Sequence, residues 1–271
     1  MRFFKELGEI LLCGDRDKKF AEFKRFYSGY KVGHYEIVDD GEILELKEPS
    51  YAKFCDVVEM KNLDKKSSKQ NKDAAFLHSI AHIEYSAIDI ALDAAYRFRG
   101  LPKRYYDDWL EVAEDEIRHF EMIEQYMQNF GVKYGDMQVH NGLFVALKMT
   151  ENSLLERMAV LPRYMEANGL DANAFMLKKL ENNDTKAALK EILQVILDEE
   201  ISHVSKGDRW FKFECERKNV DPNEYIAIVQ RIYPNSFMQS RELNEEARLK
   251  SGFSALEIER IKQIARNRAY K

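Results

Sequence analysis

Two stretches of this 271-residue chain decide its fold: WLEVAEDEIRHFEM at residues 109–122 and ILDEEISHVSKGDRWF at residues 196–211. In each stretch the apolar residues recur at the spacing of an amphipathic helix, which gathers them on one face. Glu116 and Glu200 interrupt those apolar faces. A lone carboxylate turned toward a core costs several kcal/mol or takes up a proton, so each glutamate predicts a compensating partner.

Each of these glutamates is followed at the third position by a histidine, His119 after Glu116 and His203 after Glu200. Residues i and i+3 of a helix point to nearly the same side, so each pair presents one oxygen and one nitrogen donor to one ion. Two Glu-x-x-His motifs, with a lone glutamate on each of two further helices, form the ligand set of di-iron helix bundles. The pattern therefore predicts a di-metal centre.

The lone glutamates come from the other two predicted helices. Glu84 lies among apolar residues in the first helix and precedes Glu116 by 32 residues. In the third helix both Glu151 and Glu166 can face inward. Glu166 precedes Glu200 by 34 residues, which matches the first half, whereas Glu151 precedes it by 49. We prefer Glu166, although it lies near the predicted helix end, and keep Glu151 as the alternative ligand.

The helical period begins at residue 73, and few Gly and Pro residues interrupt it. Long helices are predicted at 73–98, 104–130, 141–168 and 184–216, with a short helix near 171–181. Long helices with mostly short connections are typical of a four-helix bundle, so we expect an all-α fold. Around this bundle (73–216) we expect a mixed N-terminal extension (1–72) and a C-terminal extension (217–271) with two or three shorter helices. The N-terminal extension is expected to hold helices at 2–12 and 15–28, a hairpin around Asp40-Gly41 and a polar linker at 61–73.

Composition excludes several classes of protein. The net charge of −5 gives no global reason to expect nucleic acid or an anionic membrane as a partner. The chain has no apolar stretch of about 18 residues, and its start lacks the apolar core of a signal peptide. Three widely spaced cysteines suggest reduced thiols in a cytoplasmic protein. A Gly-rich phosphate loop, a GxSxG elbow and an HExxH motif are all absent from the sequence.

Four segments carry a resemblance to a known family: AHIEYSAIDIALDAAYRF (81–98), WLEVAEDEIRHFEM (109–122), ERMAVLPRYMEANGLD (156–171) and ILDEEISHVSKGDRWF (196–211). They resemble the ferritin-like di-iron carboxylate superfamily and, more narrowly, its branch called domain of unknown function 455. The resemblance covers residues 73–216 and continues into the tail. It implies a ferritin-like bundle and the ligands Glu84, Glu116, His119, Glu166, Glu200 and His203. A tRNA-hydroxylating enzyme is among the functional cousins that the resemblance suggests.

The charge balance supports this ligand set. Four glutamates carry −4 and two ferrous ions carry +4, so the filled site is neutral. Carboxylate and imidazole donors suit iron or manganese, in an Fe/Mn or all-manganese form as well as di-iron, and leave zinc open. Asp115 and Glu199 each precede a ligand glutamate and are either acceptors for the free N–H of the opposite histidine or solvated surface acids.

Other residues near the predicted site have ordinary explanations beside functional ones. Tyr85 and Tyr126 are candidates to line a cavity or relay electrons, although core packing is the preferred explanation for aromatic residues in so aromatic-rich a chain. His78 and His82 form an i, i+4 pair. Because no third ligand is evident, we expect both to be hydrogen-bonded helix residues.

Three functions fit the sequence. The preferred one is an oxidoreductase that activates dioxygen or peroxide and oxidises or hydroxylates an unidentified small or RNA-linked substrate, with an unidentified electron donor. The second is an iron-binding ferroxidase or storage protein. It ranks lower, because the segments outside the bundle would obstruct the assembly of a closed storage cage. The third is a non-catalytic helical scaffold. The sequence is compatible with a homodimer.

Overall fold

The computed structural model describes residues 2–39, 41–63, 72–238 and 242–269. Helices dominate this part of the chain, and two short strands, β1 (Val57–Val58) and β2 (Val139–His140), pair in parallel. The all-α prediction is therefore confirmed. The chain divides into two compact units, residues 1–148 and 149–271. Within the described residues no helix combines the length and apolar character that crossing a membrane requires.

The first unit is built around two long helices, α4 (Lys72–Arg97) and α5 (Lys103–Met127). They match the helices predicted at 73–98 and 104–130. The last residues of the second predicted range form a separate 3-10 helix, Gln128–Phe130. The short connection between them turns at Gly100, whose φ of 69° favours glycine. The apolar stripe predicted for α5 is fully buried: Trp109, Val112, Ala113, Phe120, Ile123 and Met127.

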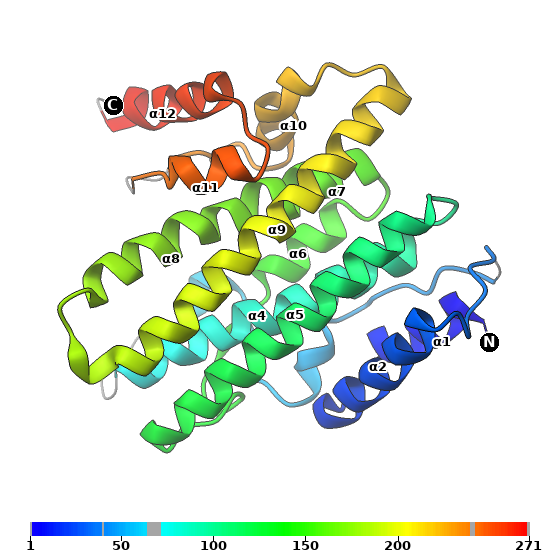
Figure 1. Ribbon diagram of the computed structural model, residues 1–271, viewed down its shortest axis with the longest axis horizontal. Helices are drawn as coiled ribbons and strands as arrows, with labels where there is room; N and C mark the ends of the chain where they lie inside the picture. Colours follow the sequence, from blue (N-terminus) through cyan, green and yellow to red (C-terminus); the bar gives the residue numbers. More distant parts are fainter. Residues whose placement is uncertain (1, 40, 64–71, 239–241, 270–271) are drawn as a thin grey trace. The chain divides into compact units, whose positions relative to one another are not determined.

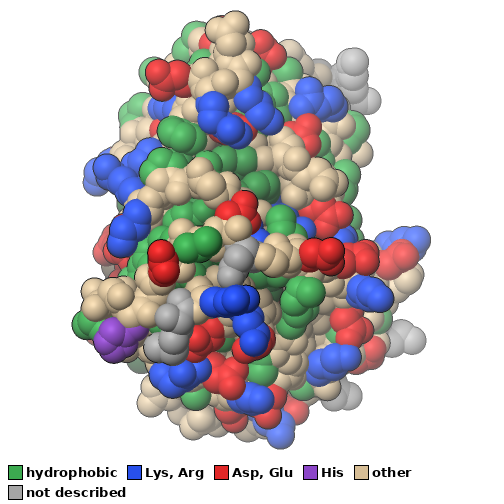
Figure 2. Space-filling model, turned by 90° about the vertical axis from the view of Figure 1, so that its right-hand side faces the viewer, with side chains coloured by type: hydrophobic (Ala, Val, Ile, Leu, Met, Phe, Trp, Pro, Cys, Tyr) green, Lys and Arg blue, Asp and Glu red, His purple; other side chains and the backbone are tan. Residues whose placement is uncertain are grey.

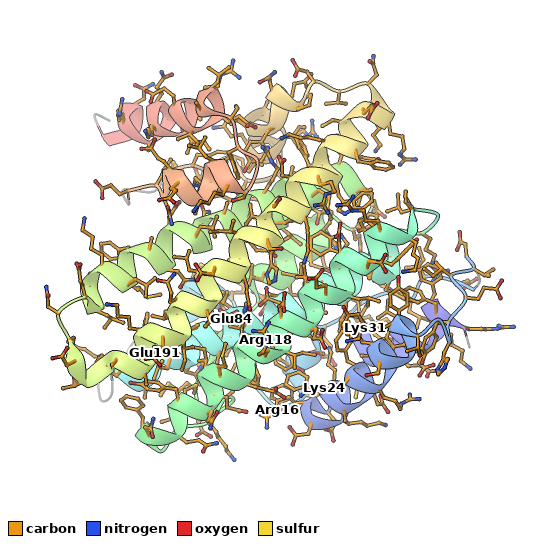
Figure 3. All side chains as sticks on the ribbon, viewed as in Figure 1. Arg16, Lys24, Lys31, Glu84, Arg118 and Glu191 are labelled. Atoms are coloured by element: carbon orange, nitrogen blue, oxygen red, sulfur yellow. The ribbon has the colours of Figure 1, made fainter. Side chains whose placement is uncertain are left out.

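A helical hairpin of α1 (Phe3–Leu11) and α2 (Arg16–Lys31) packs on this pair, α1 against α4 and α2 against α5 (Figure 1). Asp15 caps α2 by accepting a hydrogen bond from the amide of Lys18 at 3.0 Å. Basic side chains along α2, three of them labelled in Figure 3, form ion pairs with acids of α5: Arg16–Glu124, Lys24–Glu121 and Lys31–Glu114. The helix predicted at 15–28 corresponds to α2, which ends three residues later, at Lys31.

The predicted hairpin around Asp40-Gly41 is wrong. Residue 40 itself lies outside the described residues, and the described residues on either side of it form no ladder with one another. Glu36 instead forms a bridge with Arg2. The segment is held by α4 and by the turn that follows it: the amide of Leu44 donates to the Tyr96 hydroxyl of α4 at 3.0 Å, and Arg99, just after α4, donates to the Gly41 carbonyl at 2.8 Å. These side-chain contacts replace the strand pairing that the alternating pattern suggested. The polar linker predicted at 61–73 falls largely on residues 64–71, outside the described residues.

The second unit is built around α9 (Ala187–Lys218) and a long rod that packs along it. The rod consists of α7 (Leu154–Val160), a π-helical segment (Leu161–Glu166) and α8 (Ala167–Leu180). The helix predicted at 184–216 is confirmed as α9. The first residues of the predicted range form a 3-10 helix, Asp184–Lys186, directly before it.

The boundaries predicted for the third helix, 141–168, are wrong. It breaks after α6 (Gly142–Met149), and α7 starts anew with Ser153 accepting from the amide of Glu156 at 3.3 Å. The rod then continues past Gly169, because one glycine costs a helix only about 1 kcal/mol. The predicted helix at 171–181 is the end of this rod. Pro162 cannot make the usual helical hydrogen bond, and it lies in the wider π-helical turn.

The described residues in the C-terminal part of the second unit include three shorter α-helices, as predicted: α10 (Tyr225–Ile232), α11 (Glu245–Lys250) and α12 (Ala255–Ala269). Of these, α10 packs on α7, and α11 packs on α8 and α9. On the face drawn in Figure 2, acidic and basic side chains are interspersed, which agrees with the small net charge.

Candidate metal centre

Three donor groups of the first unit meet between α4 and α5. Glu84 comes from α4, while Glu116 and His119 lie one turn apart on α5. Figure 3 marks Glu84 on α4 and Arg118 on α5. Nδ1 of His119 lies 3.4 Å from Oε2 of Glu84 and 3.5 Å from Oε2 of Glu116. One ligand atom from each residue lies within 4.8 Å of the others, so this group could hold a metal ion.

All three side chains are buried: Glu116 and His119 are 0% exposed and Glu84 is 5% exposed. Burial by itself lowers the pKa of His119, but the carboxylates of Glu116 and Glu84 beside it raise that pKa to about 11. In the metal-free chain the imidazole therefore carries a proton at neutral pH. Its positive charge compensates part of the negative charge that the two glutamates bring into the core.

The separations within this group are longer than those of short charge-assisted hydrogen bonds and match those of ligands around one cation. A charge-assisted hydrogen bond between imidazolium and carboxylate has its heavy atoms about 2.7–2.9 Å apart. Two donor atoms that are each about 2.1 Å from one ion, at angles between about 90° and 110°, lie about 3.0–3.4 Å apart. His119 Nδ1 stands at 3.4 and 3.5 Å from two carboxylate oxygens at once. The residues present therefore fit a cation with oxygen and nitrogen ligands.

The second unit repeats the Glu-x-x-His arrangement on α9. Nδ1 of His203 lies 3.8 Å from Oε1 of Glu200, and the two residues are 0% and 7% exposed. Glu166 ends the π-helical segment of the neighbouring rod; it is half-buried, and its Oε2 atom is buried. Glu151, the alternative ligand, lies in the turn between α6 and α7 and is half-buried. The choice of Glu166 over Glu151 stays a prediction.

The two acids predicted to accept from the ligand histidines are both half-buried. Asp115 pairs with Arg118 on its own helix, with Oδ1 and Nη2 2.5 Å apart. Glu199 precedes Glu200 on α9. Their predicted role toward the opposite histidines stays a prediction.

Tyr85 and Tyr126 differ in their surroundings. Tyr85 is fully buried against Phe20, Phe54 and Phe120. Its hydroxyl lies 3.3 Å from Ser50 Oγ, and Ser50 lines a cavity of about 230 Å³ in the first unit. Burial raises the pKa of Tyr85, so its phenol stays neutral. Tyr126 is half-buried and packs on Phe130. No role in catalysis follows from either position.

His78 and His82 are hydrogen-bonded helix histidines, as expected. Nε2 of His82 lies 2.7 Å from the carbonyl of His140 and donates to it, so Nδ1 accepts from the Tyr134 hydroxyl at 2.9 Å. Nε2 of His78 accepts from the amide of Gly135 at 3.1 Å. Burial lowers the pKa of His82 to about 3 and that of His78 to about 4. Sequence reasoning missed Tyr134 as a partner of His82, because the two residues are 52 positions apart in the chain.

Comparison with known proteins places the chain in a family. The model of the family described as "Protein of unknown function (DUF455)" matches residues 12–259. A protein of Haemophilus influenzae described as "Uncharacterized protein" is 34% identical over 198 residues, which cover 70% of this chain and 68% of that protein. No solved structure gave a significant match. The chain belongs to the DUF455 family.

Proposed function

We propose that this chain is a di-iron or iron–manganese carboxylate oxidoreductase with a ferritin-like helical bundle. The observation that carries the proposal is the buried group of Glu84, Glu116 and His119, whose donor atoms are spaced as the ligands of one cation. Soluble proteins bury carboxylates at such density only with a compensating charge. In the proposal a metal ion supplies that charge.

The second ion rests on the sequence pattern and on α9. Each half of the pattern offers one lone glutamate and one Glu-x-x-His pair, which makes the proposed ligand set Glu84, Glu116, His119, Glu166, Glu200 and His203. The buried Glu200 and His203 are already paired on one face of α9. With two divalent ions, the four glutamates would be neutralised.

The residues of the chain have distinct tasks in this proposal. His119 and His203 would each supply one nitrogen ligand, and the four glutamates of the set would supply the oxygen ligands. Ions held by these residues would supply redox chemistry, that is, electrons for reducing dioxygen or peroxide while an organic substrate is oxidised. The proposed substrate is a small or RNA-linked molecule, and an electron donor restores the reduced site.

Metal stoichiometry tests the proposal against the other two functions. Protein purified without chelator would be loaded anaerobically with ferrous ions, and bound iron would be counted by mass spectrometry of the elements. We expect two ions per chain. Uptake far beyond two ions would favour storage, and the absence of iron and manganese binding would leave only the helical scaffold.

A further inference from the structure

Glu166 ends a π-helical segment, and the residue that anchors this segment is Arg163. π-Helical turns are rare in proteins and are frequently found at functional sites. The side chain of Arg163 is 0% exposed although it carries a permanent charge. Such a charge inside a core requires partners that are held in place.

Arg163 finds these partners on two other helices. Its Nε donates to Oδ1 of Asp208 on α9 at 2.8 Å, and its Nη2 donates to Oε1 of Glu257 on α12 at 2.9 Å. Both acids are buried and have further donors, Lys212 for Asp208 and the amide of Ser254 for Glu257. The guanidinium also lies 4.2–4.9 Å from the centroids of three aromatic rings: Phe211, Tyr225 and Phe253.

The backbone of the π-helical segment is held as well. The Tyr225 hydroxyl donates to the carbonyl of Arg163 at 2.7 Å, an acceptor inside the segment itself. Next to it, Pro162 packs directly on Gly207 of α9, where an added Cβ would lie 2.3 Å from Cβ of Pro162. The segment is thus fixed to α9 at the turn before Glu166.

These contacts are placed along α9 in a definite order. Asp208 lies five residues after His203 and eight after Glu200, so it is on the same rigid helix as the two proposed ligands. Arg163 lies three residues before Glu166, less than one turn away in the same π-helical segment. The Arg163–Asp208 pair therefore fixes the distance between the turn that carries Glu166 and the helix that carries Glu200 and His203.

We propose that Arg163 is a positioning residue for the metal centre: its pairing with Asp208 and Glu257 sets where Glu166 stands relative to the ligands on α9. This inference rests on the proposed function, because it requires Glu166 to be a ligand. It also gives the C-terminal segment a role. Although α10 and α12 supply no proposed ligand, they control the site through Tyr225 and Glu257.

Binding of cobalt(II) to the full chain tests the inference, because the visible absorption of this ion reports its ligands and their geometry. The variants are Arg163→Lys, which keeps the charge but loses the fork of donors, and Glu257→Gln, which removes the negative charge of one partner. Losing partners that orient ligands typically weakens metal binding 10- to 100-fold. We expect cobalt affinity to fall about tenfold or more in both variants, with a changed absorption spectrum.

A matched control separates positioning from general stability. Ile261 is buried on α12 and is absent from the Arg163 ion pairs. Ile261→Ala should lower the melting temperature yet keep the wild-type cobalt spectrum and affinity. Tyr225→Phe removes only the hydroxyl that bonds the Arg163 carbonyl, and it serves if the charge variants fail to fold. In the metal-free chain, amide hydrogen exchange at residues 161–167 should be faster in Tyr225→Phe than in Ile261→Ala.

The outcomes distinguish the two proposals. If the wild-type chain binds no cobalt, the proposed function fails and this inference fails with it. If the wild type binds two ions and Arg163→Lys, Glu257→Gln and Tyr225→Phe bind them with unchanged affinity and spectrum, only the positioning role is overturned. The same holds if Ile261→Ala reproduces the changes of the charge variants.

Discussion

Glu84 of α4 and His119 of α5 meet with Oε2 and Nδ1 3.4 Å apart, and the same nitrogen lies 3.5 Å from Glu116. One imidazole nitrogen thus faces two buried carboxylates. A proton on that nitrogen and a metal ion bound to it satisfy the same negative charge, so the two must compete.

This competition predicts a proton release on metal binding. The neighbouring carboxylates raise the pKa of His119 to about 11, so at pH 7 the imidazole is protonated and must lose its proton before it binds a metal. Ferrous ion should release about one proton from this residue, and its apparent affinity should rise with pH up to about pH 11. Calorimetric titration at pH 7 in two buffers of different ionisation enthalpy measures the release.

The variant Glu116→Gln keeps the shape of the side chain but removes one of the charges that hold the proton. Its His119 pKa should be lower than in the wild type, as nuclear magnetic resonance of the imidazole would show. A wild-type chain that binds iron without releasing protons at pH 7 would contradict the competition.

A second prediction concerns the two Glu-x-x-His helices. The double variant Glu116→Ala and Glu200→Ala should lose di-metal binding while its circular dichroism stays that of a helical protein. The double variant Glu114→Ala and Glu191→Ala is the matched control, since it changes exposed glutamates on the same two helices. Glu191 is labelled in Figure 3. Stoichiometric metal binding that survives in the first variant would place the ligands elsewhere.

The sequence could predict the group around His119 because its signal is local. A glutamate on an apolar stripe with a histidine at the third position fixes both side chains on one helix face, and α5 places them there. The same reasoning found α4, α5 and α9 to within three residues at each end, since long periodic helices have a strong sequence pattern.

The features that sequence reasoning missed depend on partners far along the chain. The extended segment after Gly41 follows side chains of α4 and of the turn after it rather than its own alternating pattern. The π-helical turn at Pro162 depends on contacts with α9 and α12, which no local period reveals. A lysine such as Lys19 is ordinarily expected at the surface, but here it is buried. Its partner Asp89 lies 70 residues away in the sequence, in α4.

The Lys19–Asp89 pair gives a third prediction. Lys19 is 0% exposed and donates to Asp89, to Ser50 Oγ at 2.9 Å and to the Leu11 carbonyl at 3.0 Å. Lys19→Met leaves the Asp89 carboxylate buried without its cation, so the free energy of unfolding should fall by about 3–5 kcal/mol. Urea unfolding measures the change.

The exposed pair of Lys24 and Glu121 is the control for this measurement, with side chains 56% and 47% exposed and 2.8 Å apart. Water screens such a pair, so Lys24→Met should cost less than about 1 kcal/mol. If the two variants lost the same free energy of unfolding, the burial of the Lys19–Asp89 pair would make no difference to its contribution to stability.

His78 gives the last prediction, a loss of stability in mild acid. Its side chain is 2% exposed, and Nε2 accepts from the amides of Gly135 and Met137 at 3.1 and 3.4 Å. Burial lowers its pKa to about 4, although Asp136 opposes the shift, while the unfolded chain has a histidine pKa of about 6.5. Between these values the unfolded chain binds a proton that the folded chain excludes. Stability is therefore complete above about pH 6.5 and falls as the pH drops toward 4, by up to about 1.4 kcal/mol per pH unit.

The variant His78→Gln isolates this contribution, because its side-chain oxygen still accepts from the amides but does not titrate. Urea unfolding of the metal-free chain at pH 7 and pH 5 should show a difference in unfolding free energy smaller than in the wild type, by up to about 2 kcal/mol. His34 is exposed, and His34→Gln should leave the difference unchanged. His82, whose pKa burial also lowers, stays present in all three proteins, so its effect cancels in the comparison. A His78→Gln chain with the wild-type difference would mean that the folded protein takes up the proton at His78 as readily as the unfolded chain does.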